Sequence, residues 1–345
     1  MQVDNVERLG DRQRSDILAL VEAATEVDRT PPLSEQVLLA VRGDLNAGTG
    51  LADGTDPAPS THPAPGTDPA PGTSSRHILA YAGTQLAGYA HLKCGLAGEA
   101  GTAEVVVDPA WRRQGVGTAL VRVLETALEH LAKPLQLWSH GHLDPARAFA
   151  LRDGYSTVRE LWQMHRLLRS GDDGSLPAVS LPEGFHARAF VVGQDEEAWL
   201  RVNARAFVDH PEQGRMTRQD LDQRIDEPWF DAAGFILIED TRSPAPVLAA
   251  SHWTKVVQAQ SPQTSPALHP LGEVYVVGVD PAYQGLGLGR AVTVLGLAHL
   301  REQGLTEAML YVDADNRAAV ATYARLGFTR CAVDVMYSPT VHPPV

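Results

Sequence analysis

The alternation of hydrophobic and polar residues predicts the same order of helices and strands in both halves of the chain. Residues 15–24 and 196–207 place apolar side chains at helical spacing, which predicts an amphipathic helix in each half. Residues 77–93 and 235–257 each predict two strands with a turn between them. Residues 318–326 predict a further helix, which ends at a glycine. The expected fold class is therefore α/β, of the mixed α+β type.

Two segments of the chain repeat one another. Residues 105–120 read VVVDPAWRRQGVGTAL, and residues 277–292 read VGVDPAYQGLGLGRAV. Each is an apolar strand-like run, then Asp-Pro-Ala-aromatic, then a glycine-rich turn and a helix-like stretch. A second pair, residues 138–155 and 311–328, aligns without a gap. The period is too long for a solenoid, so the repeat predicts two tandem domains of one fold.

The repeat and the local composition predict the domain limits. We expect one domain at residues 1–169 and a second at residues 182–345, joined by a linker at residues 170–181 with the sequence SGDDGSLPAVSL. Residues 45–75 contain TDPAPGT-type units rich in Pro, Gly, Thr and Ala. Such a composition cannot bury enough apolar surface to offset its chain entropy, which predicts a disordered insert in the first domain.

Composition and charge narrow the choice of partners. The chain has 345 residues, of which 44% are hydrophobic, and a formal net charge of −13. This balance disfavours nucleic-acid binding, which needs a basic face, and suits a cationic ligand. No apolar run approaches the roughly 20 residues of a membrane helix, and residues 1–14 lack the apolar core of a signal peptide. We therefore expect a cytoplasmic protein. We also expect no metal, since Cys94 and Cys331 belong to no metal-binding pattern.

The repeated glycine motif is the feature that most strongly indicates a cofactor. Its pattern, Q/R-x-x-G-x-G/A, begins at Gln284 in the second half and at Arg112 in the first. Glycines let a backbone with exposed amides approach a ligand closely, and the helix that follows presents unpaired N–H groups and a positive dipole end. Together these features predict a pyrophosphate site in each half.

The spacing of the glycines separates the possible phosphate ligands. A dinucleotide fingerprint, G-x-G-x-x-G, would need glycine at Arg290 and Leu120, and a P-loop would need Gly-Lys-Ser/Thr. Both copies fail both tests. Instead, the motif and the preceding VxVDP strand resemble the coenzyme A loop of the GCN5-related N-acetyltransferase superfamily. The resemblance implies acetyl-CoA as cosubstrate and, in each domain, a mixed, mostly antiparallel sheet flanked by helices.

A closer resemblance covers both halves apart from the proline-rich insert. The tandem arrangement and the segments VNARAFVDHPEQG, SHWTKV and LYVDADNRAAVATYARLGF resemble the mycothiol synthase family. Members of that family acetylate the cysteinyl amine of the cysteine-glucosamine-inositol precursor. The resemblance therefore implies this small-molecule amine as the substrate, and we expect a monomer.

The resemblance also implies roles for individual residues. It makes Glu273 the general base and a substrate ligand, and Tyr323 the general acid for the departing thiolate. The substrate contacts it implies are Glu35, Glu212, Lys255, Glu273 and Tyr311. The acetyl-CoA contacts it implies in the second domain are Val277, Gly278, Val279, Gln284, Gly285, Leu286, Gly287, Leu288, Gly289, Arg290, Asn316, Arg317, Ala318, Ala319, Val320 and Ala321. Those in the first domain are Val105, Val106, Val107, Arg113, Gln114, Gly115, Val116, Gly117 and Thr118.

Gap-free alignment of the two halves predicts that only the second is catalytic. Gly101 aligns with Glu273, Ala150 with Tyr323, and Leu143 with Asn316. The first domain keeps the pyrophosphate loop but lacks both the acid and the base. We therefore expect it to bind acetyl-CoA without transferring the acetyl group.

Two alternative functions stay open at this point. One is an N-acetyltransferase for another small amine or for a protein N-terminus, which would share the loops and differ in the substrate cleft. The other is a non-catalytic protein that senses coenzyme A. We expect direct transfer in a ternary complex, because neither cysteine lies in a motif that would make it a nucleophile.

Overall fold

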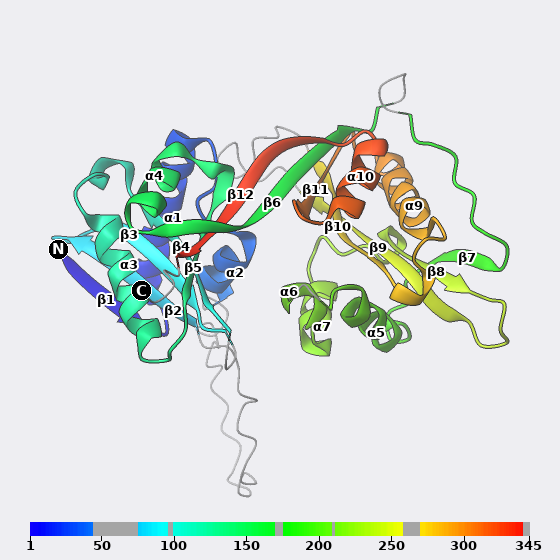
Figure 1. Cartoon of the computed structure of the whole chain (residues 1–345), viewed down its shortest axis with the longest axis horizontal. Coiled ribbons are helices and arrows are strands. Elements are labelled where there is room, and N and C mark those ends of the chain that lie inside the picture. Colours follow the sequence, from blue (N-terminus) through cyan, green and yellow to red (C-terminus); the bar gives the residue numbers. More distant parts are fainter. Residues whose placement is uncertain (44–74, 96–98, 170–174, 209–210, 258–269, 341–345) are drawn as a thin grey trace, which may run out of the picture. The chain divides into compact units, whose positions relative to one another are not determined.

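The computed structural model describes residues 1–43, 75–95, 99–169, 175–208, 211–257 and 270–340 (Figure 1). Nearly all of the insert expected at residues 45–75 and part of the linker expected at residues 170–181 lie outside these ranges. The chain forms two compact units. Unit 1 comprises Met1–Glu160 and Val333–Val345, and unit 2 comprises Leu161–Ala332.

Unit 1 is built on a mixed sheet with the strand order β1-β2-β3-β4-β5-β12. All its pairings are antiparallel except that of β4 with β5. Its strands are β1 (Gln2–Val6), β2 (Ser75–Ala82), β3 (Gln85–Lys93), β4 (Gly101–Val107), β5 (Leu135–Ser139) and the end of β12 (Thr329–Pro339). Its helices are α1 (Asp11–Asp28), α2 (Glu35–Gly43), α3 (Val116–Glu129) and α4 (Asp144–Arg152), with short turns η1 (Pro109–Trp111) and η2 (His140–His142).

Unit 2 repeats this plan with the strand order β6-β11-β10-β9-β8-β7. Again one pair, β10 with β11, is parallel. Its strands are the end of β6 (Tyr155–Leu167), β7 (Phe185–Ala189), β8 (Phe235–Asp240), β9 (Val247–Val257), β10 (Leu271–Val279) and β11 (Glu307–Asp313). Its helices are α5 (Glu196–Ala206), α6 (Pro211–Gly214), α7 (Arg218–Ile225), α9 (Leu288–Glu302) and α10 (Arg317–Arg325), with turns η3 (Ala232–Gly234) and η4 (Pro281–Tyr283).

The units exchange the ends of two strands. In β6, residues 161–167 pair with β11 of unit 2. In β12, residues 335–337, which follow all of unit 2 in the sequence, pair with β5 of unit 1. The division into units therefore differs from the one expected at residues 170–181. The sheet of unit 2 includes β6, which precedes those residues, and the sheet of unit 1 includes the end of β12, which follows them.

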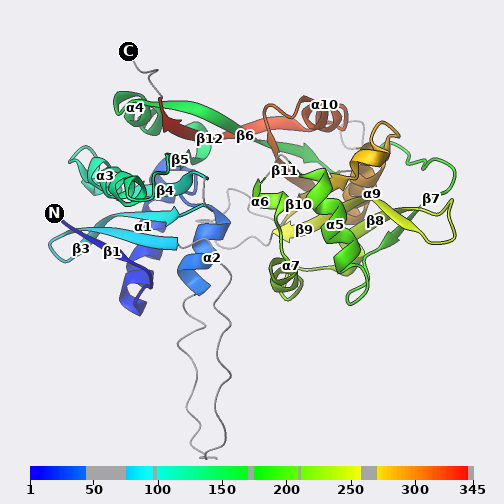
Figure 2. The same ribbon diagram turned by 60° about the horizontal axis from the view of Figure 1, so that its bottom comes forward.

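Helices cover both faces of each sheet. In unit 1, α3 packs on one face through Leu120, Leu124 and Leu128, while α1 and α2 cover the other. In unit 2, α9 and α10 lie on one face and α5 and α7 on the other, as Figure 2 shows. Helix α5 approaches β10 closely, since a Cβ on Gly278 would lie 3.4 Å from Ala206 and Phe207. Buried apolar residues on both sides of each sheet thus fix the strands that carry the site.

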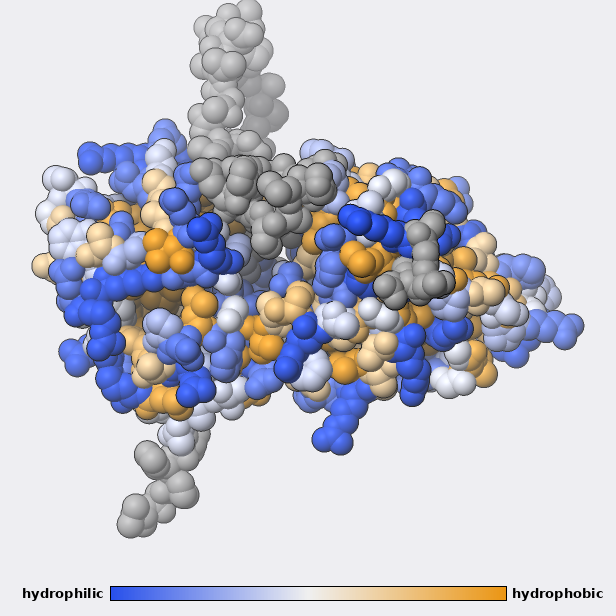
Figure 3. Space-filling model, turned by 90° about the horizontal axis from the view of Figure 1, so that it is seen from above, coloured by the Kyte–Doolittle hydropathy of each residue, from blue (hydrophilic) through white to orange (hydrophobic). Residues whose placement is uncertain are grey.

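The exterior is mixed in character. Hydrophilic and hydrophobic residues are interspersed over the face drawn in Figure 3. Among the described residues, no helix is both long and apolar enough to span a membrane.

Candidate active site

The glycine loop of unit 2 joins β10 to α9. Gly285 and Gly287 have φ values of +81° and +78°, in the left-handed region that favours glycine. A Cβ built on either would meet no heavy atom within 4 Å, so there is open space beside the loop. The amide of Ala291 bonds to the carbonyl of Gly287 at 3.1 Å, and the amides of residues 288–290 precede this first helical bond. The loop and the helix N-terminus fit an extended pyrophosphate.

The loop of unit 1 has the same backbone with a different residue. Arg113 occupies the place of Gly285 and has a φ of +62°, a conformation that is costly for a side chain other than glycine. Gly115 has a φ of +86° and precedes α3, as Gly287 precedes α9. The loop conformation is therefore retained in both units, although one of its glycines is not.

Each loop is tied to the end of the unit's first long helix by an arginine–aspartate pair. In unit 1, Arg112 donates to both carboxylate oxygens of Asp28 at 2.7 Å. In unit 2 the charges are reversed, because Arg205 of α5 donates to Asp280. Sequence reasoning missed these pairs, since the partners lie more than 70 residues apart.

Strand β10 separates from β11 near its middle. Residues 272–274 are register partners of residues 308–310, and the pairing extends no further. On the β9 side the register shifts between Val274 and Val276, so Tyr275 forms a β-bulge. A bulge bends its strand and breaks the ladder. In the described sheet, the backbone of residues 277–279 therefore has no strand partner on the β11 side, where the coenzyme's arm is expected.

Glu273 and Lys255 lie side by side next to this opening, where β10 is still paired with β11. They are register partners on β10 and β9, and partners in a sheet point to the same face. Lys255 is only 5% exposed. Its Nζ lies 4.8 Å from the ring centroid of Trp229 and 5.2 Å from that of Tyr275. The structure thus places the expected base beside a buried cation enclosed by aromatic rings.

Tyr311 belongs to the same face, two residues along β11 from the register partner of Glu273. It is 46% exposed, and Gln163 of β6 donates to its hydroxyl at 3.5 Å. His165 Nε2 and a carboxylate oxygen of Glu307 lie 3.0 Å apart, at hydrogen-bond distance, on the same face. Three of the expected substrate contacts, Lys255, Glu273 and Tyr311, are therefore brought together. Glu35 begins α2 and Glu212 lies in α6, but their side chains lie outside the described part of the chain.

Tyr323 lies on α10, against the opposite face of the sheet. Its ring packs on Phe328 with centroids 5.8 Å apart, beside the cluster that also contacts Val277. Burial raises the pKa of Tyr323 to about 12. The phenol therefore keeps its proton at neutral pH, as a general acid must.

The remaining expected cofactor contacts lie at a strand end, in a loop and in the first turns of helices. Asn316 caps α10 by accepting a bond from the amide of Ala319 at 3.1 Å, so residues 316–321 form the first turns of that helix. Residues 277–279 end β10, and residues 284–290 form the loop and the start of α9. In unit 1, residues 105–107 end β4 and residues 113–118 form the matching loop and helix start.

The bulge corrects one equivalence between the halves. Strand β4 pairs with β3 without a register shift, whereas β10 contains one additional residue. A Cβ on Gly272 would strike Leu300 of α9, and a Cβ on Gly101 would strike Leu128 of α3. Gly101 therefore matches Gly272, and the gap-free alignment of Gly101 with Glu273 was wrong by one residue.

The counterpart of Glu273 is Thr102, since each follows its matched glycine and pairs with the second residue of the parallel register. Ala150 and Leu143 do correspond to Tyr323 and Asn316, because α4 and α10 have equal length and position. Unit 1 thus has no carboxylate or phenol at the positions that match the expected base and acid of unit 2.

Unit 1 instead holds a buried charge network on the corresponding face. The amide and hydroxyl of Ser34 donate to Glu104 at 2.6 Å each. His140 lies between two carboxylates, with Nε2 3.3 Å from Glu104 and Nδ1 3.2 Å from Asp334. The contact of Nε2 with Glu104 is an ion pair only, because the geometry of Nε2 does not meet that of a hydrogen bond. Burial would lower the pKa of His140, but the two carboxylates outweigh it and raise that pKa to about 10.

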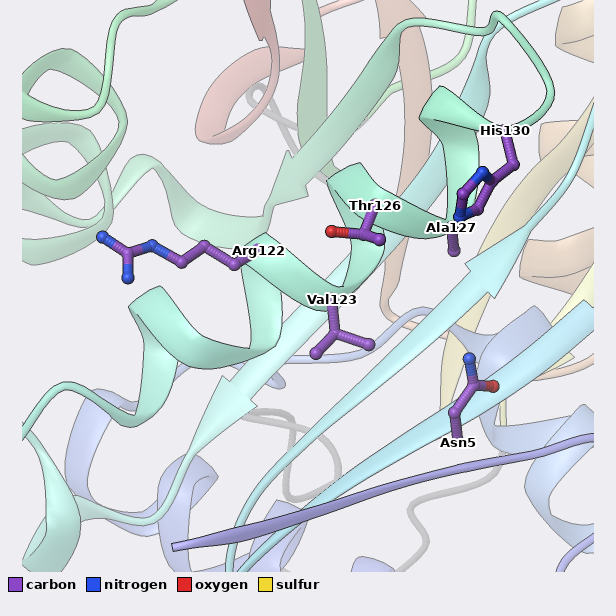
Figure 4. Close-up of a pocket in the computed structure, with 6 residues that line it drawn as sticks. All are labelled: Asn5, Arg122, Val123, Thr126, Ala127 and His130. Atoms are coloured by element: carbon purple, nitrogen blue, oxygen red, sulfur yellow. The ribbon is translucent and has the colours of Figure 1, made fainter.

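A separate pocket lies in unit 1 between β1 and α3 (Figure 4). The residues that line it are Asn5, Arg122, Val123, Thr126, Ala127 and His130. None of them is an expected site residue, and the pocket is open to solvent. The described residues contain no group of three or more His, Cys, Asp or Glu side chains suited to a metal ion.

Known proteins share both the sequence and the fold. Residues 204–328 match the acetyltransferase (GNAT) family, and residues 73–157 match an acetyltransferase (GNAT) domain. A mycothiol acetyltransferase of Thermomonospora curvata is 48% identical over 336 residues, which are 97% of this chain and 96% of that one. One of Kytococcus sedentarius is 51% identical over 77% of this chain and 82% of its own.

Among solved structures, a GCN5-related N-acetyltransferase from Sphaerobacter thermophilus is 23% identical. It covers 99% of this chain and 97% of its own, with a TM-score of 0.64, which shows a shared fold. The two family matches coincide with the two glycine loops, and the identity to curated relatives extends over nearly the whole length. The chain therefore belongs to the mycothiol acetyltransferases of the GNAT family and is an acetyl-CoA-dependent acyltransferase.

Proposed function

We propose that unit 2 transfers the acetyl group of acetyl-CoA directly to the cysteinyl amine of the cysteine-glucosamine-inositol precursor, which forms mycothiol. The parting of β10 from β11 beside the glycine loop carries this proposal. It leaves a strand edge for the arm of the cosubstrate at the one place where Glu273 and Lys255 are close by. The names of the relatives support the choice of amine.

The site has the features that acetyl-CoA requires. Gly285 and Gly287, with open space beside them, and the amides of residues 288–290 would hold the pyrophosphate. The edge of β10 at residues 277–279 would pair with the pantetheine arm. When bound, acetyl-CoA supplies the acetyl group as an activated thioester.

Two side chains move the protons. Glu273 accepts the proton that the ammonium group of the substrate must lose before its nitrogen attacks the carbonyl carbon. The N–C bond forms as the C–S bond breaks. Tyr323 donates its proton to the departing sulfur, and the second proton, which the nitrogen loses on becoming an amide, returns through water to Tyr323. Because Glu273 and Tyr323 approach from opposite faces of the sheet, the gap between β10 and β11 is where both can reach the reacting atoms.

The remaining contacts recognise the substrate, and unit 1 has a different role. Lys255 and Tyr311, with Glu212 and Glu35, suit a ligand that carries an ammonium group and many hydroxyls. Unit 1 binds acetyl-CoA in its own loop without transferring the acetyl group, because Thr102 and Ala150 stand where unit 2 has its base and acid.

The test is release of the coenzyme A thiol from acetyl-CoA with the cysteinyl-glucosaminyl-inositol amine, beside generic amines. Glu273→Gln should abolish release, while Thr102→Val, the matched change in unit 1, should leave it near the native rate. Release only with another amine would move the proposal to a different N-acetyltransferase. Acetyl-CoA binding without release for any amine would favour a coenzyme A sensor.

A further inference from the structure

Two of the three lysines in the chain occupy the same place in the two sheets. The three are Lys93, Lys133 and Lys255. Lys255 is the register partner of Glu273, and Lys93 is the register partner of Thr102. Because Thr102 is the counterpart of Glu273, the two lysines are counterparts as well. Unit 1 therefore keeps the lysine of this pair and has lost the carboxylate.

The surroundings of Lys255 hold its ammonium in place. The ring of Trp229 and the ring of Tyr275, the bulged residue, each lie within about 5 Å of Nζ. Arg224 of α7 donates from Nε to the Tyr275 hydroxyl at 3.0 Å, which fixes that ring. Aromatic faces attract a cation but do not neutralise it, and a buried charge is costly unless an anion lies near.

We propose that Lys255 is a positioning residue for the general base, and that its ammonium keeps the carboxylate of Glu273 ionised and directed toward the opening above Val274. The side chains of register partners start about 4.5–5.5 Å apart, well within the reach of a lysine and a glutamate. The inference rests on the proposed function, in which Glu273 is the base.

Several other charged or titratable side chains among the described residues of β6, β11, α5 and α7 have partners of their own. Arg224 from α7 is bonded to Tyr275. Glu307 of β11 is paired with His165 of β6, and Tyr311 accepts from Gln163. Arg205 of α5 is bonded to Asp280. Lys255 is thus the described cation that lies directly opposite Glu273.

The consequence appears in the pH dependence of turnover. A cation next to a carboxylate lowers its pKa by roughly 1–3 units, so removal of the ammonium raises it. In Lys255→Met, which keeps length and packs among the rings, the acidic limb of kcat/KM should move to higher pH by about one unit or more. Lys255→Arg should restore the limb to its native position. Lys93→Met, the matched change in unit 1, should leave the profile unaltered.

The profile also separates positioning from mere contact, because ionisation of the substrate amine is the same for every variant. A Lys255→Met enzyme with a raised KM at every pH and an unmoved limb would overturn the inference. So would an equal shift in Lys93→Met. The proposed function fails separately, if Glu273→Gln retains native turnover while Lys255 is unchanged.

Discussion

Units 1 and 2 have the same fold and the same loop, yet they differ where chemistry is expected. The loop survives even where Arg113 has replaced a glycine, because it works through backbone amides. The acid and base positions depend on side chains, and unit 1 has Ala150 and Thr102 there. The comparison teaches that a loop made of backbone and a site made of side chains can diverge separately in a duplicated domain, since the two rest on different parts of the chain.

The units also differ in how they treat buried charge on the corresponding face. Unit 2 has one buried lysine beside Glu273, under a strand that bulges at Tyr275. Unit 1 has no bulge in β4 and fills its face with the Glu104–His140–Asp334 network. A strand that opens suits a ligand, whereas an internally paired network suits a fixed structure.

The largest effect should come from Tyr323, the proposed acid of unit 2. Tyr323→Phe removes the proton donor and retains the ring that packs on Phe328. We expect kcat to fall by about 10²–10⁴-fold, the range for loss of a general acid. Coenzyme A release at saturating substrate measures it, with acetyl-CoA affinity as the control for folding. Native kcat in this variant would assign the acid to another group and remove one of the two differences between the units.

A smaller effect, on stability, should come from the network of unit 1. His140→Leu leaves Glu104 and Asp334 buried without their shared cation. We expect the free energy of unfolding of unit 1, measured by urea denaturation at pH 7, to fall by about 3–5 kcal/mol. Adding Glu104→Gln and Asp334→Asn should recover part of the loss, because it removes the charges left unpaired.

The same network gives the units different pH responses. The pKa of His140 is raised to about 10, so its stabilisation is complete below about 6.5 and is lost as the pH rises through 10. His252, buried in unit 2, has its pKa lowered to about 4 and is neutral throughout that window. Between pH 7 and 10 the difference in free energy of unfolding between the native chain and His140→Leu should therefore shrink. The difference between the native chain and His252→Leu should stay constant over the same range. An unchanged His140 difference would contradict a charged imidazole.

The smallest effect should come from the loops. Gly285→Ala should destabilise unit 2 by about 1–2 kcal/mol, because alanine disfavours a φ of +81°. Arg113→Gly in unit 1 relieves the same strain but raises the entropy of the unfolded chain. The net change in the free energy of unfolding should therefore stay within about 0.5 kcal/mol. Thermal unfolding of both variants tests this. A large loss from Arg113→Gly would show that its side chain, rather than its backbone, supports the loop.

Much of the fold was predictable because its signals are local. The amphipathic helices, the strand pairs and both glycine loops were expected from spacing alone, and α5 at Glu196–Ala206 differs from its prediction by one residue. The equivalence of Thr102 with Glu273 was not predictable, because a bulge adds a residue to a strand without changing the local composition in a recognisable way. The Glu104–His140–Asp334 network was also missed, since Asp334 lies 194 residues beyond His140.

The exchange of strand ends affects the order in which the chain can fold. Asp334 and residues 335–337 of β12, which complete unit 1, are synthesised only after the whole of unit 2. Until they leave the ribosome, β5 has an uncovered edge, and His140 lacks Asp334. An exposed edge strand invites pairing with other chains. A nascent chain that stalls within unit 2 therefore carries an unfinished, aggregation-prone unit 1, so unit 1 is completed last although most of it is made first.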